Sequence, residues 1–232
     1  QLEEVAKTAD NTDHFFKASD DPDTDSVGAY VEGASATAAG EAASAIGFGA
    51  TAFGGGAMAL GELATASGYG AVASQKWSVA YGVGSQSTAQ SAVAIGGQMV
   101  VINGDTWEEE IWSTTASGQE STAIGTAARA TQYGSTAVGV VAEASGESAT
   151  ALGQAATARG NQSVAIGGQA RAYGVFSTAV GSWSQARGPR STAVGEGAIQ
   201  GNRLDLTMST GRLGKLAISD AVVTVPRFVP DG

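Results

Sequence analysis

Small apolar residues alternate with polar ones along most of the chain, and the alternation repeats every fourteen residues. The repeat follows the pattern G-x-x-A-x-A-x-G-x-x-S-x-A-[VIL], whose positions we number from 1 to 14. Alternation with a period of two predicts a β-strand, so each half-repeat of seven residues predicts one short strand and one turn. Glycine at positions 1 and 8 suits turns that need a positive φ. One repeat therefore predicts one rung of a parallel β-solenoid.

A larger apolar residue at position 14 marks each rung. From Ile124 to Val194 these residues are fourteen apart five times in succession. Earlier in the chain the spacing is twenty-one between Leu60 and Tyr81, and twenty-nine between Ile95 and Ile124. The first interval contains an additional half-repeat and the second an insertion of fifteen residues. About ten rungs, stacked at the strand spacing of about 4.8 Å, would stand roughly 50 Å tall.

The two sides of each predicted strand carry different residues. Positions 4, 6, 11 and 13 are nearly all Ala or Ser, which predicts a roll too thin for larger side chains. Positions 5 and 7 are polar, as in Glu143 and Ser145, and are expected to face water. Positions 12 and 14 hold Thr or Val followed by Ile, Val or Leu, which predicts an outward apolar ladder.

Such a ladder, left bare, would be a hydrophobic patch of the kind that monomers avoid. We therefore expect a sister chain to cover it, although a tolerated apolar stripe on a monomer is the alternative. The residues predicted to form the subunit interface are Ile46, Leu60, Ile95, Ile124, Val138, Leu152, Ile166, Val180 and Val194.

Composition changes this picture little. Glycine accounts for 34 of the 232 residues, and aromatic residues for 6%, so a core of Leu and Phe is hard to build. With 15% charged and 43% hydrophobic residues the chain does not have the composition of a disordered protein. There is no cysteine, so stability has to come from packing or assembly. A net charge of −10 makes nucleic acid an unsuitable partner, and no stretch of about 20 apolar residues predicts a membrane-spanning helix.

The repeated motifs "STAIG", "STAVG", "SVAIG" and "ASAIG", each following A-x-A-x-G, resemble the YadA-like head repeat of trimeric autotransporter adhesins from Gram-negative bacteria. The resemblance extends over about residues 33–195, and "DNTDHFFKA" resembles the segment that leads into such heads. It implies an all-β fold, a left-handed parallel β-roll, with three identical chains side by side around one axis. It also implies a surface protein, anchored in the outer membrane through a further C-terminal region. Such proteins are non-catalytic and need no cofactor; they bind host matrix, host cells, other bacteria or abiotic surfaces, with roles in virulence and biofilm formation.

The chain divides into four predicted parts. Residues 1–17 have an a/d-like seam and read as the end of a coiled-coil stalk, with a frayed amphipathic turn as the alternative. Residues 18–32 form an acidic loop. Its Asp21, Asp23, Asp25 and Glu32 have the spacing of a calcium loop, but a solvated loop is favoured because no helix pair flanks it. Residues 33–200 form the roll, and residues 201–232 a small β subdomain that caps it or connects it onward.

The insertion at residues 97–117 is the main interruption of the repeat. "NGD" between two apolar runs predicts a β-hairpin, with Trp107, Glu108, Glu109 and Trp112 as candidate ligand-binding residues. The alternative is that both Trp side chains pack onto the roll or onto a neighbouring subunit. Further candidate contacts lie at turns, at Phe176, Trp183 and Arg190, with Gln154 and Asn161 beside them.

The sequence contains no recognisable catalytic set. His14 is the single histidine, and neither a P-loop nor a zinc-binding spacing is present. The serines of "STAVG" recur in every rung without a base nearby, so we interpret them as structural and the protein as no enzyme. Two other functions remain open: a trimeric phage tail-fibre segment, and an ice-binding solenoid that uses the Thr-x-Val/Ile ladder as a monomer. A mass near that of one 22.9 kDa chain would favour the last.

Overall fold

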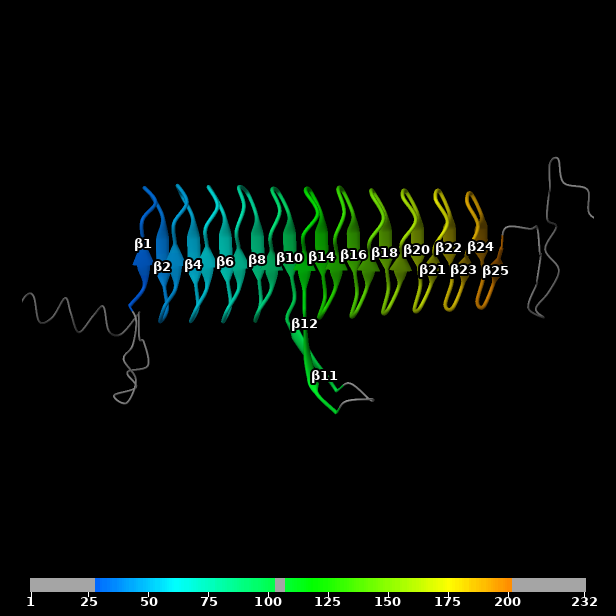
Figure 1. Cartoon of the computed structure of the whole chain (residues 1–232), viewed down its shortest axis with the longest axis horizontal. Coiled ribbons are helices and arrows are strands. Elements are labelled where there is room, and N and C mark those ends of the chain that lie inside the picture. Colours follow the sequence, from blue (N-terminus) through cyan, green and yellow to red (C-terminus); the bar gives the residue numbers. More distant parts are fainter. Residues whose placement is uncertain (1–27, 103–106, 202–232) are drawn as a thin grey trace, which may run out of the picture.

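Each half-repeat forms one strand and one turn, and successive half-repeats alternate between two parallel sheets (Figure 1). The computed structural model describes residues 28–102 and 107–201. The prediction of an all-β parallel roll with fourteen-residue rungs is confirmed, since each strand pairs in register with the one fourteen residues further along, as Thr136 pairs with Thr150. The hand of the coil and the trimer stay predictions. The predicted stalk, the acidic residues Asp21, Asp23 and Asp25, and residues 202–232 of the predicted β subdomain lie outside the described residues.

The first sheet has twelve strands of two residues, formed by positions 5 and 6. They are β1 (Tyr30–Val31), β3 (Ser44–Ala45), β5 (Met58–Ala59), β7 (Val72–Ala73), β9 (Gln86–Ser87), β13 (Thr115–Ala116), β15 (Arg129–Ala130), β17 (Glu143–Ala144), β19 (Thr157–Ala158), β21 (Arg171–Ala172), β23 (Gln185–Ala186) and β25 (Ile199–Gln200). Strand β1 lies within the range predicted as the acidic loop and pairs with β3.

The second sheet has eleven strands of three residues, formed by positions 12 to 14. They are β2 (Thr37–Ala39), β4 (Thr51–Phe53), β6 (Thr65–Ser67), β8 (Val79–Tyr81), β10 (Val93–Ile95), β14 (Thr122–Ile124), β16 (Thr136–Val138), β18 (Thr150–Leu152), β20 (Val164–Ile166), β22 (Thr178–Val180) and β24 (Thr192–Val194). This sheet therefore has one strand more than the ten rungs predicted. The prediction counted rungs by a large apolar residue before glycine, and some of the earliest rungs lack one at position 14.

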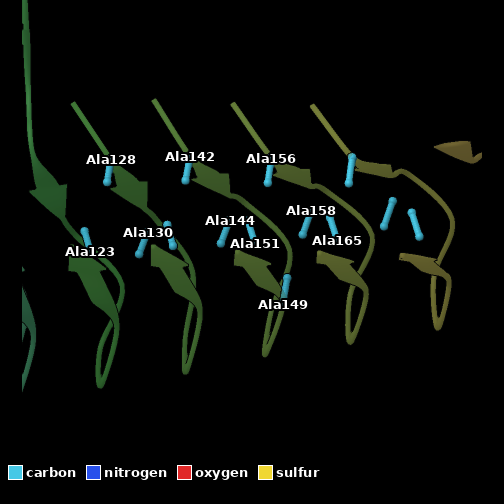
Figure 2. Packing of buried hydrophobic residues seen from close by; sticks show 14 of the residues in the cluster. Ala123, Ala128, Ala130, Ala142, Ala144, Ala149, Ala151, Ala156, Ala158 and Ala165 are labelled. Atoms are coloured by element: carbon cyan, nitrogen blue, oxygen red, sulfur yellow. The ribbon is translucent and has the colours of Figure 1, made fainter. Parts of the chain in front are cut away.

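The interior is built from alanine. Every buried hydrophobic residue among the described residues is Ala, and the buried polar ones are Ser with one Thr. Figure 2 shows why: Ala144 and Ala158 of one sheet and Ala151 and Ala165 of the other point into the same narrow space. A larger side chain would force the sheets apart, which overpacks a close-packed interior.

The two turns of each rung form two opposite edges of the roll. We call positions 1–3 the first-turn edge and positions 8–10 the second-turn edge. At position 1 glycine does have a positive φ, as at Gly139 with 132°. At position 8 the prediction is wrong, because Gly160 and Gly174 are not among the positive-φ residues. A Cβ on Gly160 would instead fall on the backbone carbonyl of Gly174, so close stacking of rungs requires glycine there.

The ladder predicted at position 14 also needs a correction. Strand pairing puts Phe53, Ser67 and Tyr81 in the same column as Ile95. Ile46 and Leu60 instead follow β3 and β5 and lie at position 7, on the twelve-stranded sheet. The additional half-repeat between Leu60 and Tyr81 moves the apolar residue from one sheet to the other, which alignment on "apolar residue before glycine" cannot reveal.

Candidate binding surfaces

The outer face of the eleven-stranded sheet carries the predicted ladder from β10 to β24. Parallel pairing stacks Ile95, Ile124, Val138 and Leu152 directly above one another, with Ile166, Val180 and Val194 following in the same column. These side chains are all partly exposed in the single chain; Ile124 and Ile166 are each 37% and Val194 68% exposed. The ladder is therefore a continuous apolar column that the described part of the chain leaves uncovered.

The outer face of the twelve-stranded sheet changes character along the roll. Up to β7 it carries Tyr30, Ile46, Met58, Leu60 and Val72. From β15 onward the same positions carry Arg129, Glu143, Arg159, Arg171 and Arg187 among other residues. The late part of this sheet therefore suits contact with water and the early part does not.

The insertion forms a hairpin that leaves the roll at the first-turn edge (Figure 1). Strands β11 (Gln98–Ile102) and β12 (Glu109–Ser113) pair antiparallel, with Val100 opposite Ile111. Residues directly opposite one another share a face, so both faces of the hairpin carry apolar side chains. Trp107 is 82% exposed, Ile111 63% and Trp112 39%, so neither Trp is buried against the roll of its own chain.

Three acidic residues, Glu108–Glu110, lie next to these apolar groups in the sequence, and one of them contacts Trp112. The Trp112 indole Nε1 donates a hydrogen bond to Glu110 Oε2 at 3.1 Å. Glu108 and Glu109 are exposed. The hairpin thus offers a Trp- and Ile-rich surface with a negatively charged margin, a combination that suits an amphipathic or basic partner.

Thr114 anchors the base of the hairpin, and the sequence analysis did not identify it. Its hydroxyl Oγ1 lies 3.0 Å from the Gly97 carbonyl and 2.7 Å from the Gly125 carbonyl. It stands at position 4, otherwise Ala or Ser in the roll, and its side chain is fully buried. A threonine at an alanine position directly after the insertion was the available signal.

The candidate contacts at the turns do not join the hairpin in one site. Phe176 and Arg190 lie on the second-turn edge, one rung apart, with the Arg190 guanidinium carbon 6.0 Å from the Phe176 ring centre. Trp183 lies on the first-turn edge, as the hairpin does, but several rungs further along. Gln154 and Asn161 likewise lie on opposite edges. The predicted ligand-binding residues therefore form separate patches.

Charged groups pair mainly across neighbouring rungs. Arg159 Nη2 donates to Glu143 Oε2 at 3.1 Å. Partial burial pushes the pKa of the Glu143 carboxyl upward, but the hydrogen bond and charge of Arg159 outweigh it, and the pKa lies below its usual value. Tyr133 donates to Glu120 at 3.0 Å, which raises the pKa of the Tyr133 hydroxyl. In the described ranges no group of three His, Cys, Asp or Glu could hold a metal ion, and no helix is long and apolar enough to cross a membrane.

The buried serines of the described ranges donate hydrogen bonds to backbone carbonyls where they donate at all. Ser78 and Ser135, at position 11, each donate to the carbonyl of a Gln at position 8. Where position 8 is glycine, the hydroxyls of Ser121, Ser163, Ser177 and Ser191 have no protein partner. The hydrogen bonding of these hydroxyls depends on the residue at position 8, as expected of serines that only fill space in the interior.

These features define a parallel β-solenoid with an uncovered apolar column and one projecting hairpin. The profile of the YadA head domain repeat matches residues 38–61, 52–74, 59–85, 116–140, 144–170 and 172–198, which together make up more than half of the chain. The protein belongs to the YadA head domain repeat family, a family of non-enzymatic adhesin heads. A comparison with curated protein sequences gives no match.

Proposed function

We propose that the chain is the head of a homotrimeric bacterial surface adhesin, anchored in the outer membrane by a further region, that presents its hairpin to a ligand. The ligand would be host matrix, a host cell, another bacterium or an abiotic surface, which places the protein in virulence or biofilm formation. Family membership supports the adhesin class. The uncovered column of Ile95, Ile124 and Leu152 supports the trimer, because identical chains around one axis would bury it.

We choose the hairpin as the ligand-binding element because its apolar side chains are exposed. A two-stranded hairpin is marginally stable alone, and one with Trp and Ile on its surface gains from a partner. Trp107 and Trp112 are the expected anchors, because Trp often dominates interfaces, with Glu108 and Glu109 at the margin. Three hairpins per trimer would sum weak contacts through multivalency. Phe176, Trp183 and Arg190 are the second set of candidate contacts.

A deletion tests this proposal without disturbing the roll. Removing the fifteen residues Met99–Ser113 joins Gln98 to Thr114 and restores a fourteen-residue rung. The joined sequence "AIGGQ" then matches residues 165–169, where the roll makes the same turn without an insertion. We expect the deletion variant to keep its mass in light scattering and to lose binding in a ligand array. Unchanged binding by an intact trimer would contradict the role of the hairpin.

Point variants separate the anchors from the margin. Trp107→Ala and Trp112→Ala should each weaken binding at least tenfold, whereas Glu108→Gln and Glu109→Gln should change mainly its salt dependence. Light scattering of the unchanged chain distinguishes the alternatives: a mass of 22.9 kDa would favour the ice-binding monomer, and about three times that mass an adhesin or a phage fibre. A membrane anchor encoded downstream would separate the last two.

A further inference from the structure

The outer face of the eleven-stranded sheet continues into both edges of the roll. In each rung the chain passes from the second-turn edge through positions 12 and 14 to the first-turn edge. In one rung this path places Phe176, Thr178, Val180 and Trp183 in succession across the roll. Phe176 is 50% and Trp183 51% exposed, so the apolar band reaches past the ladder at both ends.

At three heights large side chains occur on both edges. At one height Trp183 of the first-turn edge lies between Phe176 and Arg190 of the second-turn edge. Because strands stack with one rung per fourteen residues, position along the chain gives height along the roll.

The same match recurs at two further heights. At one of them, Val140 and Val141 of the first-turn edge lie half a rung from Tyr133 of the second-turn edge. At the other, Tyr69 of the first-turn edge lies at a height between Leu63 and Trp77 of the second-turn edge. Tyr69, Val140, Tyr133, Leu63 and Trp77 are all exposed.

Between two of these heights, those of Tyr133 and Phe176, both edges become polar or small. Gln154 and Ala155 of the first-turn edge stand level with the interval from Glu147 to Asn161 on the second-turn edge. At these heights large groups therefore match large groups and polar residues match polar ones. The match does not extend to the first rungs, where exposed Phe48 stands level with Gly55 and Gly56.

The fold of a single chain gives no reason for this match. The two edges lie at opposite ends of the strands and cannot touch each other within one roll. A threefold axis parallel to the roll, however, brings one edge of a subunit to the other edge of the next, and it relates the copies without any shift in height. Matching heights are then what a closed ring of subunits needs.

We propose that in the trimer the first-turn edge of each subunit packs against the second-turn edge of the next, with Trp183 against the Phe176–Arg190 pair of the adjacent copy. This rests on the proposed trimer. Arg190 already lies over the Phe176 ring, so the arriving indole would complete an aromatic and cationic cluster. The three side chains would then serve assembly in place of ligand binding.

The absence of cysteine makes the proposal testable by disulfide trapping. Ser182→Cys and Pro189→Cys in one chain put one thiol on each edge at matching heights. Within a chain the two lie at opposite ends of a strand, roughly 16 Å apart at about 3.3 Å per residue, too far for a disulfide. Ser182→Cys with Glu147→Cys is the matched control, because its thiols differ in height by about 12 Å.

We expect the oxidised Ser182→Cys/Pro189→Cys protein to run as a covalent trimer in a non-reducing gel and the control to run as a monomer. A protein that is trimeric by light scattering but gives no covalent trimer would overturn the edge contact and leave the trimer standing. A monomeric mass for the unchanged chain would overturn both.

A second pair of variants does not depend on oxidation. Trp183→Arg should raise the concentration at which the trimer dissociates at least tenfold. Arginine suits the backbone there, since Arg190 has nearly the same positive φ, 57° against 62°. Tyr173→Arg, on the outer face of the twelve-stranded sheet, should leave that concentration unchanged. Equal effects of the two substitutions would also count against the edge contact, and circular dichroism checks that both variants are folded.

Discussion

The early rungs, from β1 to β10, and the late rungs, from β13 to β25, have the same interior and different surfaces. From β3 to β24 the strands of both sheets bury alanine at their inward position, with Ser87 in β9 as the exception. Outside, the late rungs keep aliphatic residues on the eleven-stranded sheet and charged or polar ones on the other. The early rungs put Ile46, Met58 and Leu60 on the twelve-stranded sheet, and Phe53 and Tyr81 on the eleven-stranded one.

The difference shows that the roll has two periods. Its interior repeats every seven residues, because both sheets bury the same small side chains. Its surface repeats every fourteen residues, because the two sheets carry different outward residues. Two of the family matches, at residues 52–74 and 59–85, begin half a rung apart, so the early sequence fits the repeat in either register. Half-repeats are thus interchangeable in the interior, whereas a shift by one half-repeat exchanges the residues of the two outer faces.

The strongest test of the shared interior is overpacking in each half. Ala66→Leu in β6 and Ala165→Leu in β20 each add three carbon atoms at a fully buried position. Each should lower the free energy of unfolding by about 3 kcal/mol, measured by denaturant unfolding followed by far-UV circular dichroism. Thr178→Val, on the outer side of β22, is the control. Tolerance of leucine in one half alone would mean that the two interiors differ.

The outer faces should respond unequally to charge. Leu60→Arg and Thr131→Arg both change position 7 of the twelve-stranded sheet. Leu60→Arg should cost about 1–2 kcal/mol, because it removes a half-buried apolar side chain. Thr131→Arg should stay within about 0.5 kcal/mol, since Arg159 and Arg187 already occupy this column. Equal thermal midpoints for the two variants would remove the distinction between early and late surfaces.

The buried serines should follow the residue at position 8 in both halves. Ser78→Ala in an early rung and Ser135→Ala in a late one each remove a hydroxyl that donates to a Gln carbonyl, and each should cost about 1 kcal/mol. Ser163→Ala removes a hydroxyl without a protein partner and should be neutral or stabilising. Thermal unfolding of the three variants measures this, and a loss at Ser163 equal to that at Ser135 would contradict it.

The smallest expected effect concerns the charged late surface. Glu143→Gln removes the pair with Arg159, which is partly exposed, so the cost should be about 0.5 kcal/mol or less. The folded state lowers the pKa of Glu143 from 4.5, so the pair stabilises above that pH and the contribution disappears as pH falls through the lowered pKa. Thermal midpoints of both proteins should therefore differ at pH 7 and converge in acid. A difference that persists at pH 2 would show that packing, rather than charge, is responsible.

The sequence predicted the interior well because only one arrangement of the strands buries its small residues. Alternating Ala and Ser at seven-residue spacing can be buried only in thin stacked rungs, and the strands lie where the pattern places them. The sheet to which each strand belongs was harder to predict. Ile46 and Val138 precede glycine in the same motif, and only counting half-repeats through the interval between Leu60 and Tyr81 puts them on different sheets.

The candidate sites were predicted less completely for a physical reason. A turn residue such as Trp183 tolerates many side chains, so its type alone does not indicate a contact. Likewise, the sequence shows the same residue, glycine, at positions 1 and 8 for different reasons. Position 1 has a positive φ, whereas position 8 needs glycine because the rungs stack closely. Both the contacts of a turn residue and the need for glycine depend on residues about fourteen positions away, in the adjacent rungs. A local sequence pattern does not include those residues.

The hydrogen bonds of the roll run along its length, from each rung to the next, as from Val164 N to the Ser177 carbonyl at 2.9 Å. Tension applied between the two ends therefore passes through every rung in series, and no rung shares the load with another. We expect a stretched roll to yield by peeling, one rung at a time from an end, and to lengthen in steps set by the fourteen-residue rung. Three rolls held edge to edge would have to peel together, which would make assembly the main source of resistance to a pulling force.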